Sequence, residues 1–366
     1  MPGAPIDIAI IGAGIAGCAA ALTLAGGARS VIVVAPPAVP AARIGEFLSP
    51  AANALLAELG LTADFAAGPH RQANATFSAW GSDLLAARNA IIHVEGPGHV
   101  LDRSAFEAML RTAVAHRGVT TLGSAVTGAD RADGAWSLRL SGGERMRARF
   151  LLDCSGRAAV VTRHLARRHH ADRLVAAYGF LHQHDDSVVP TPATLIEAAP
   201  NGWWYASLLP DQRLALALFA DPDTLPRGIA REMLVWRNSI ATTTHIQRWA
   251  EDAGFAIEAL PRLASAATTW LAPVAGTDWA AAGDAAAAFD PLSSHGLTTA
   301  LWSGRRAAQA ATSALLGDPA PLARYAATLE DAVQDFLRQR RGIYAHEHRW
   351  REQPFWQRRI SDPHVD

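Results

Sequence analysis

The chain contains 366 residues, half of them hydrophobic, and carries a formal net charge of -1. This length and composition provide enough apolar surface for two domains or one large composite domain. The nearly neutral charge excludes a bulk electrostatic attraction to nucleic acid or to an anionic membrane.

Residue usage narrows the chemistry further. All 33 basic residues are arginine and no lysine is present, so a mechanism that needs a lysine amine, such as a Schiff base, is excluded. The two distant cysteines, Cys18 and Cys154, do not suggest a disulfide framework, and we expect a cytoplasmic location. The sequence has no CxxC or HExxH pattern. We therefore predict no metal site, with His169-His170, His182 and His184 as solvated loop residues.

Near the N-terminus, a strand-like run from Ile8 leads into Gly12-Ala13-Gly14-Ile15-Ala16-Gly17, and a helical run continues to Leu24. The first glycine allows a tight turn, the second lets a pyrophosphate approach, and the third allows close helix packing. Free N–H groups at the helix start favour phosphates. The pattern predicts a dinucleotide site in which the contacts are Gly12, Gly14, Ile15, Ala16 and Gly17.

Two other interpretations of this stretch are possible. One is a buried strand–turn–helix without a ligand. The other is a membrane segment, since Ile8 to Leu24 is almost wholly apolar, but the glycine spacing disfavours it. No basic region precedes the run, so it does not resemble a signal peptide.

The next elements follow from periodicity and turn signals. In chain order we expect a strand at Ser30–Val34, a helix from Ala51 that ends at Gly60, strands at Ala75–Gly81 and Ala90–Val94, a helix over Ser104–His116 with Ser104 as N-cap, hairpins turning at Asp133-Gly134 and Ser141–Gly143, and a strand at Phe150–Asp153. At the end of the second strand stands Ala35, where a Rossmann domain usually places an acid for the ribose.

The second half alternates between strand and helix patterns. We expect strands at Thr194–Glu197, Trp203–Leu209 and Arg213–Phe219, helical structure over residues 226–260, a strand at Thr268–Leu271, a helix from Ser294 toward Leu316, and a C-terminal helix over Pro321–Tyr344.

Three separated stretches favour FAD over NAD. They are the glycine turn, Asp153-Cys154-Ser155-Gly156, and Gly283-Asp284 followed by Asp290 to Leu297. Asp284 can accept the hydrogen bonds of ribityl hydroxyls. A second helix start near Gly296 and Leu297 would stabilise negative charge at the flavin N1/O2 edge.

These motifs resemble those of the flavoprotein aromatic monooxygenase superfamily, which has the p-hydroxybenzoate hydroxylase fold. The resemblance covers most of the chain. It implies an α/β protein with a Rossmann-like FAD-binding domain (1–72, 98–172 and 266–318), an inserted β-rich substrate domain (73–97 and 173–265) and a C-terminal helical segment (319–366). It also implies further cofactor contacts: Arg43, Arg103, Val126, Asp153, Gly156, Gly283, Asp284, Pro291, Gly296 and Leu297.

A narrower resemblance points to one branch near the tryptophan halogenases. It rests on Arg43–Glu46 with Pro50, Ser78–Ser82, Gly202–Tyr205, Phe289–Ser294, and Arg349-Trp350 with Pro354–Trp356. This branch includes flavoproteins that hydroxylate a tryptophan of a partner protein during maturation of quinone-cofactor amine oxidases and dehydrogenases. Halogenation itself is disfavoured, because the halogenases use a lysine and a Trp-x-Trp-x-Ile-Pro motif, and this chain has neither.

The resemblance therefore implies an FAD-dependent monooxygenase that hydroxylates an electron-rich aromatic ring through a flavin C4a-hydroperoxide. Glu46 and His295 are the catalytic candidates, for substrate positioning or proton transfer. Trp203, Trp204 and Tyr205 either line the substrate cavity or belong to the core.

No second Gly-x-Gly-x-x-Gly is present, so NAD(P)H binding transiently or another reductant is the expected electron donor. The expected partner is an aromatic substrate, which a partner polypeptide could carry, with no nucleic acid and no membrane. Three alternatives remain at this point: a hydroxylase of a free aromatic metabolite, a flavin-dependent reductase of a natural-product pathway, and a non-catalytic escort protein.

Overall fold

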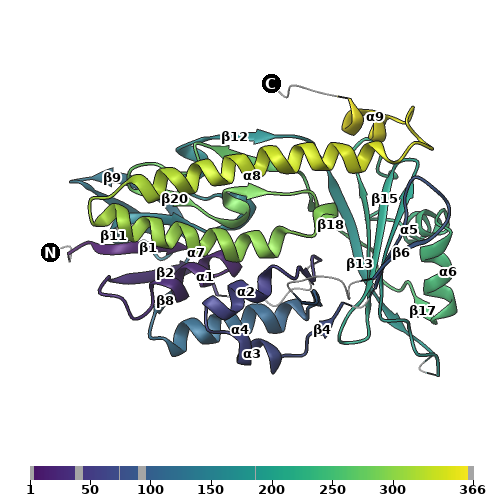
Figure 1. Cartoon of the computed structure of the whole chain (residues 1–366), viewed down its shortest axis with the longest axis horizontal. Helices are drawn as coiled ribbons and strands as arrows, with labels where there is room; N and C mark the ends of the chain where they lie inside the picture. Colours follow the sequence, from purple (N-terminus) through teal and green to yellow (C-terminus); the bar gives the residue numbers. More distant parts are fainter. Residues whose placement is uncertain (1–3, 38–43, 74, 90–95, 186, 362–366) are drawn as a thin grey trace.

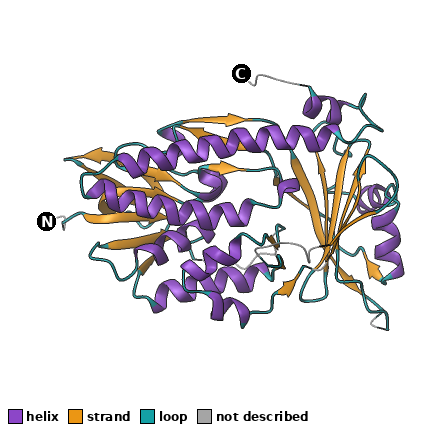
Figure 2. Ribbon diagram, in the orientation of Figure 1, coloured by secondary structure: helices purple, strands orange, loops and turns teal. Residues whose placement is uncertain are grey.

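Two large sheets lie side by side, and the long C-terminal helix α8 (Ala320–Ala345) spans from one to the other (Figure 1). The computed structural model describes residues 4–37, 44–73, 75–89, 96–185 and 187–361. Helices gather around the first sheet and on the outer side of the second (Figure 2). The expected α/β class, with a Rossmann-like unit, a β-rich unit and C-terminal helices, is confirmed.

The first sheet has the strand order β8-β2-β1-β11-β10-β9, and β20 pairs with the end of β11. Its strands are β1 (Ile6–Ile11), β2 (Val31–Ala35), β8 (Thr120–Gly123), β9 (Val126–Ala132), β10 (Ala135–Leu140), β11 (Arg145–Asp153) and β20 (Trp279–Ala281). The strands β8, β2, β1, β11 and β20 run parallel, whereas β10 is antiparallel to both neighbours. Because helices cover a parallel sheet, its central strands are continuously apolar, as Ile8 to Ile11 is.

The hairpin turns predicted in this sheet are confirmed. Asp133 and Gly134 both adopt positive φ between β9 and β10, which is the conformation that a tight two-residue hairpin requires. The second turn lies between Leu140 and Arg145 and joins β10 to β11.

Around this sheet lie α1 (Ile15–Leu24), α2 (Ala52–Glu58), α3 (Thr62–Ala66), α4 (Arg103–His116), α7 (Gly296–Leu315) and α8. The predicted cap of α4 is wrong. Asp102, not Ser104, is the N-cap, and its carboxylate accepts a hydrogen bond from the Ala105 N–H at 2.9 Å. Both residue types cap helices well, and the extended backbone of Asp102 decides between them.

The second sheet has the order β17-β13-β16-β15-β14-β5-β6, and β18 also pairs with β13. Its strands are β5 (Ala75–Ala79), β6 (Ala86–Asn89), β13 (Val175–Gln183), β14 (Thr194–Ala199), β15 (Gly202–Leu208), β16 (Leu214–Ala220), β17 (Phe255–Ala256) and β18 (Arg262–Ser265). The helices α5 (Met233–Ile240) and α6 (His245–Asp252) cover its outer face, where Trp204 stacks on Trp236. The short helix α9 (Pro354–Ile360) packs near the C-terminal end of α8.

Two three-stranded sheets complete the described strands. One joins β12 (Arg167–His170), β19 (Thr269–Ala272) and β21 (Ala287–Ala288), and the other joins β3 (Phe47–Leu48), β7 (His99–Val100) and β4 (Arg71–Gln72).

Several local predictions need correction. Residues 226–260 hold two short helices and the strand β17 instead of continuous helix. His169-His170 and His182 lie in the strands β12 and β13, not in loops, and His169 stacks on Trp270. The strand expected at Ala90–Val94 lies outside the described residues. The domain boundaries remain a prediction. Within the part of the chain that the structure describes, no helix is both long and apolar enough to cross a membrane.

Candidate active site

The glycine turn between β1 and α1 has the tight geometry that its sequence predicts. Gly12 adopts φ +103°, and a Cβ there would lie 2.5 Å from the carbonyl oxygen of Cys154. A Cβ at Gly17 would overlap the carbonyl oxygen of Gly12. At Gly14, in contrast, a Cβ would meet no described atom within 4 Å, and Gly14 caps the start of α1. The turn therefore leaves open space where the helix presents its free N–H groups.

The Gly283-Asp284 turn packs directly against the glycine turn at Gly12 to Gly17. Gly283 adopts φ +62°, and a Cβ there would lie 2.9 Å from the Cβ of Ala16. Gly304 of α7 lies so close to Ala16 that a Cβ would overlap its carbonyl oxygen. The Gly283 N–H donates to Ser303 Oγ at 2.8 Å, which fixes the turn on α7. Residues that the sequence separates widely are thus brought together at the N-terminal end of α1.

Asp284 remains available to a ligand. Its side chain is 43% exposed, and one carboxylate oxygen lies 3.5 Å from Arg157 Nε in an ion pair. Arg157 follows Gly156, which has φ +68° and starts a short turn, and it also donates to the Ala267 carbonyl. The second and third motifs therefore meet through this ion pair, next to the glycine turn.

Asp153 is engaged elsewhere. It is completely buried, and its carboxylate accepts hydrogen bonds from Ser155 N–H and Oγ, from Val161 N–H, and from Thr162 N–H and Oγ1. These five bonds fix the loop after β11. The contacts favour a structural role for Asp153, and its contact with a cofactor stays a prediction.

The start of α7 is built as an accessible helix N-terminus. Asp290 Oδ1 accepts from the Leu292 N–H at 3.0 Å, and Ser294 adopts φ 56° before the helix begins at Gly296. Gly296 is exposed, with open space around a Cβ among the described atoms, whereas Leu297 is buried. The free N–H groups at this helix start could bind a negatively charged ligand atom. Pro291 and His295, also predicted site residues, are exposed on this turn.

Glu46 is a buried acidic side chain with one carboxylate oxygen that is unpaired among the described residues. It is 1% exposed, and its Oε2 accepts from the Gly45 N–H at 2.7 Å. The Tyr205 hydroxyl lies nearby, but the buried Oε1 meets hydrogen-bond geometry with no described group. Burial raises the pKa of the Glu46 carboxyl, while Tyr205, backbone N–H groups and Arg103 act in the opposite direction. A buried acid with one unpaired oxygen is a group poised to bind or transfer a proton.

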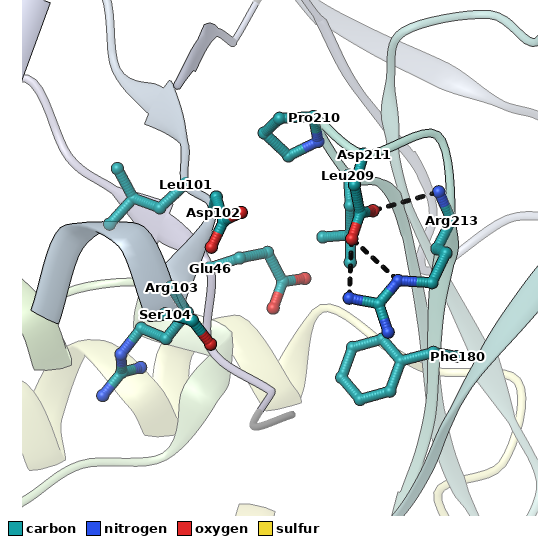
Figure 3. A pocket seen from close by; sticks show the side chains of 10 residues that line it. All are labelled: Glu46, Leu101, Asp102, Arg103, Ser104, Phe180, Leu209, Pro210, Asp211 and Arg213. Atoms are coloured by element: carbon teal, nitrogen blue, oxygen red, sulfur yellow. Dashed lines mark hydrogen bonds and ion pairs between the residues drawn. The ribbon is translucent and has the colours of Figure 1, made fainter. Parts of the chain in front are cut away.

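Glu46 lines a narrow cleft between α4 and the second sheet (Figure 3). Leu101, Asp102, Arg103 and Ser104 form one wall, and Phe180, Leu209, Pro210, Asp211 and Arg213 form the other. The Glu46 carboxylate points into the gap between these walls, and Asp211 holds Arg213 on the far side. The cavity has a volume of about 30 Å³, which is room for little more than a water molecule.

Two contacts connect this cleft to neighbouring segments, and one of them reaches α7. Arg103 Nη1 donates to the Gly45 carbonyl at 2.7 Å, so it holds the segment that carries Glu46. Ser49 Oγ and Thr298 Oγ1 lie 2.7 Å apart and join the end of that segment to the first turn of α7. The structure therefore brings Glu46 and Arg103 together and ties their segment to the helix that starts at Gly296.

Other predicted residues lie differently. Val126, the first residue of β9, is buried in a hydrophobic cluster of the first sheet with residues such as Val34 and Leu138. Arg43 lies outside the described residues. Trp203 and Trp204 are core residues on opposite faces of β15. Tyr205, on the same face as Trp203, lies beside Glu46 and affects its pKa.

Asp290, Arg340 and Tyr344 form a hydrogen-bonded group that the sequence pattern did not predict. Tyr344 donates to Asp290 Oδ2 at 2.8 Å, and Arg340 Nε donates to the same oxygen at 3.0 Å. The available signal was the acidic residue before Pro291, combined with polar side chains on the inner face of the C-terminal helix.

Comparison with known proteins shows the shared fold and the class of protein. The myxobacterial chondrochloren halogenase CndH, an FAD-dependent halogenase, superimposes with a TM-score of 0.86 at 20% identity over 99% of this chain and 87% of that one, which shows the shared fold. LodB of Marinomonas mediterranea, named as an FAD-dependent oxidoreductase, is 28% identical over 376 residues, covering 96% of both chains. The chain is an FAD-dependent oxidoreductase.

The family can also be stated. The tryptophan halogenase family model matches residues 7–94 and 84–364, so the chain belongs to this family. Among solved structures, QhpG, described as a peptidyl tryptophan dihydroxylase essential for tryptophylquinone cofactor biogenesis, is 26% identical. It has a TM-score of 0.79 over 99% of this chain and 80% of QhpG. The resemblance identified from the sequence is confirmed.

Proposed function

We propose that this protein is an FAD-dependent monooxygenase that hydroxylates a tryptophan side chain of a partner polypeptide. The observation that carries the proposal is the position of Glu46, a buried acid with an unpaired oxygen that points into the cleft between the flavin-side elements and the second sheet. The similarity to QhpG, which acts on a peptidyl tryptophan, supports the choice of substrate.

The residues present fit FAD. The open space at Gly14 lies at the start of α1, where the pyrophosphate would bind, and the half-exposed Asp284 would accept from ribityl hydroxyls. The N–H groups at Gly296 and Leu297 would face the N1/O2 edge. When bound and reduced, FAD supplies electrons and activates dioxygen for transfer to the ring. NAD(P)H or another reductant would reduce it.

Glu46 would handle the proton of the reacting ring. An electron-rich ring that accepts oxygen develops positive charge and then loses a proton. Oε1 is the free position on Glu46 to orient the ring or take that proton. His295, exposed at the turn before α7, is our second candidate, for proton exchange with solvent.

Hydroxylation is preferred to halogenation on the residues of this chain. It has no lysine and no Trp-x-Trp-x-Ile-Pro motif, the two features that the halogenases use.

The test uses the purified protein reconstituted with FAD and a reductant. We expect oxygen consumption to rise, and peroxide release to fall, when a tryptophan-containing partner polypeptide encoded beside this gene is added. A protein that binds no FAD would support the escort alternative and contradict the proposal. Stimulation by free aromatic metabolites and not by the polypeptide would favour the small-molecule hydroxylase.

A further inference from the structure

Several motifs that point to the tryptophan-halogenase branch have no place in the cofactor site, yet the structure gathers them at one position. Tyr344, near the end of α8, packs its ring against Trp80 and Trp356, with centroid distances of 5.7 and 5.8 Å. Trp80 Nε1 also donates to the Ile343 carbonyl at 2.9 Å. The C-terminal segment is therefore fixed onto the inner face of the second sheet.

The Tyr344 hydroxyl connects that sheet to the turn before α7. It accepts a hydrogen bond from Trp203 Nε1 at 3.0 Å and donates one to Asp290 Oδ2 at 2.8 Å. All three side chains are 1% exposed or less, so water does not compete for these bonds. We call Trp203, Tyr344, Asp290 and Arg340 the Tyr344 network.

Asp290 links the Tyr344 hydroxyl to the turn before α7. Its Oδ1 caps the Leu292 N–H, while its Oδ2 accepts from both Tyr344 and Arg340. Arg340 in turn donates to Asp172 Oδ2 at 2.8 Å. The carboxylate is therefore held at both oxygens, and the turn that it caps leads directly into the exposed N-terminus at Gly296.

We propose that Tyr344 is a positioning residue that acts through Asp290 on the turn over residues 291–296. It orients this turn so that the N–H groups at Gly296 and Leu297 face the flavin N1/O2 edge. Trp203 connects the turn to the second sheet through its hydrogen bond with Tyr344. The inference rests on the proposed function, which places FAD at that helix start.

The physical consequence concerns the charge state of the flavin. Reduced flavin carries negative charge at this edge, which a correctly aimed helix N-terminus stabilises. Loss of the hydroxyl would let the turn relax. The reduced cofactor would then lose more binding free energy than the oxidised cofactor, and the reduction potential of the bound flavin would fall.

The test compares Tyr344→Phe with the wild-type holoprotein. This substitution keeps the ring contacts with Trp80 and Trp356 and removes both hydroxyl bonds. We expect the ratio of the dissociation constants of reduced and oxidised FAD to rise about 3- to 10-fold, together with a shifted flavin absorbance spectrum. Trp203→Phe removes the N–H donor together with part of the buried ring, and it should move both readouts in the same direction, but less.

Tyr325→Phe is the matched control. Tyr325 is also buried on α8, and its hydroxyl donates to the Ala281 carbonyl at 2.6 Å and not to Asp290. The Tyr325→Phe substitution should lower the free energy of unfolding without changing the reduction potential of the bound flavin.

The outcomes separate this inference from the proposed function. If wild type binds FAD and hydroxylates its substrate while Tyr344→Phe and Trp203→Phe leave the potential and spectrum unchanged, the inference is overturned alone. If Tyr344→Phe does not fold, an unchanged Trp203→Phe potential overturns it as well. Absence of FAD from the wild-type protein would overturn both.

Discussion

Ala16 and Gly283 lie in contact across two motifs that the chain separates widely: a Cβ built at Gly283 would sit 2.9 Å from the Cβ of Ala16. The contact places the Gly283-Asp284 turn beside the first turn of α1. A single extended ligand can therefore reach the helix N–H groups and the Asp284 carboxylate together. The glycines at this junction therefore have different roles. Gly12, Gly17 and Gly283 allow close backbone packing, whereas Gly14 leaves open space at the start of α1.

Gly14→Ala and Gly17→Ala should separate these purposes. The Cβ of Gly14→Ala enters open space and its backbone φ is ordinary, so we expect the apoprotein to lose less than about 1 kcal/mol while FAD affinity falls at least about tenfold. Gly17→Ala overlaps the Gly12 carbonyl and should unfold the apoprotein more easily. Thermal unfolding and FAD titration check this. Normal FAD affinity in Gly14→Ala would rule out a pyrophosphate at this position.

Asp284→Ala should weaken FAD binding with little effect on folding. A charge-assisted hydrogen bond to a ribityl hydroxyl contributes about 1.5–3 kcal/mol, which corresponds to roughly 10- to 100-fold in affinity. The matched control is Glu58→Ala, because Glu58 is 47% exposed and also pairs with an arginine, Arg305. Equal FAD affinity in the two variants would remove the ribityl role from Asp284.

Asp153→Ala should behave in the opposite way. Its five hydrogen-bond donors, three of them fully buried, would lose their acceptor, and we expect the free energy of unfolding of the apoprotein to fall by on the order of 3 kcal/mol or more. Urea unfolding without FAD measures this. Full apoprotein stability combined with a specific loss of FAD would show that Asp153 serves the cofactor instead.

These contrasts mark what the sequence can predict. The turn at Gly12 to Gly17 and the hairpin at Asp133-Gly134 were predictable, because a few neighbouring residues determine their backbone conformation. The five bonds of Asp153 depend on how the chain folds back at Val161 and Thr162, which no local pattern encodes.

Long-range polar contacts were equally inaccessible. Tyr344 and Asp290 meet through the packing of α8 on two sheets, and the residues between them in sequence carry no periodic signal of that contact. Helix capping at Asp102 was mispredicted because Asp102 and Ser104 are both good caps and only the backbone conformation separates them.

Glu46→Gln should reveal the raised pKa of Glu46. The ordinary pKa of this carboxyl is 4.5, and burial raises it in the folded protein. The carboxyl therefore contributes its full stability below pH 4.5, and that contribution is lost as the pH rises through the folded-state pKa. We expect Glu46→Gln to match wild type near about pH 4 and to be more stable at about pH 8.

Urea midpoints across this pH range measure the difference, and Glu58→Gln reports the response of a half-exposed carboxyl. A Glu46→Gln difference that is constant with pH would contradict the raised pKa.

The central claim is that dioxygen supplies an atom to a tryptophan of a partner polypeptide. The most direct measurement reacts the FAD-loaded, reduced protein with a tryptophan-containing candidate partner polypeptide under ¹⁸O₂ and maps the product by peptide mass spectrometry. We predict ¹⁸O on a tryptophan of that polypeptide, absent without FAD or reductant. An unlabelled polypeptide, despite FAD-dependent consumption of oxygen, would contradict the claim.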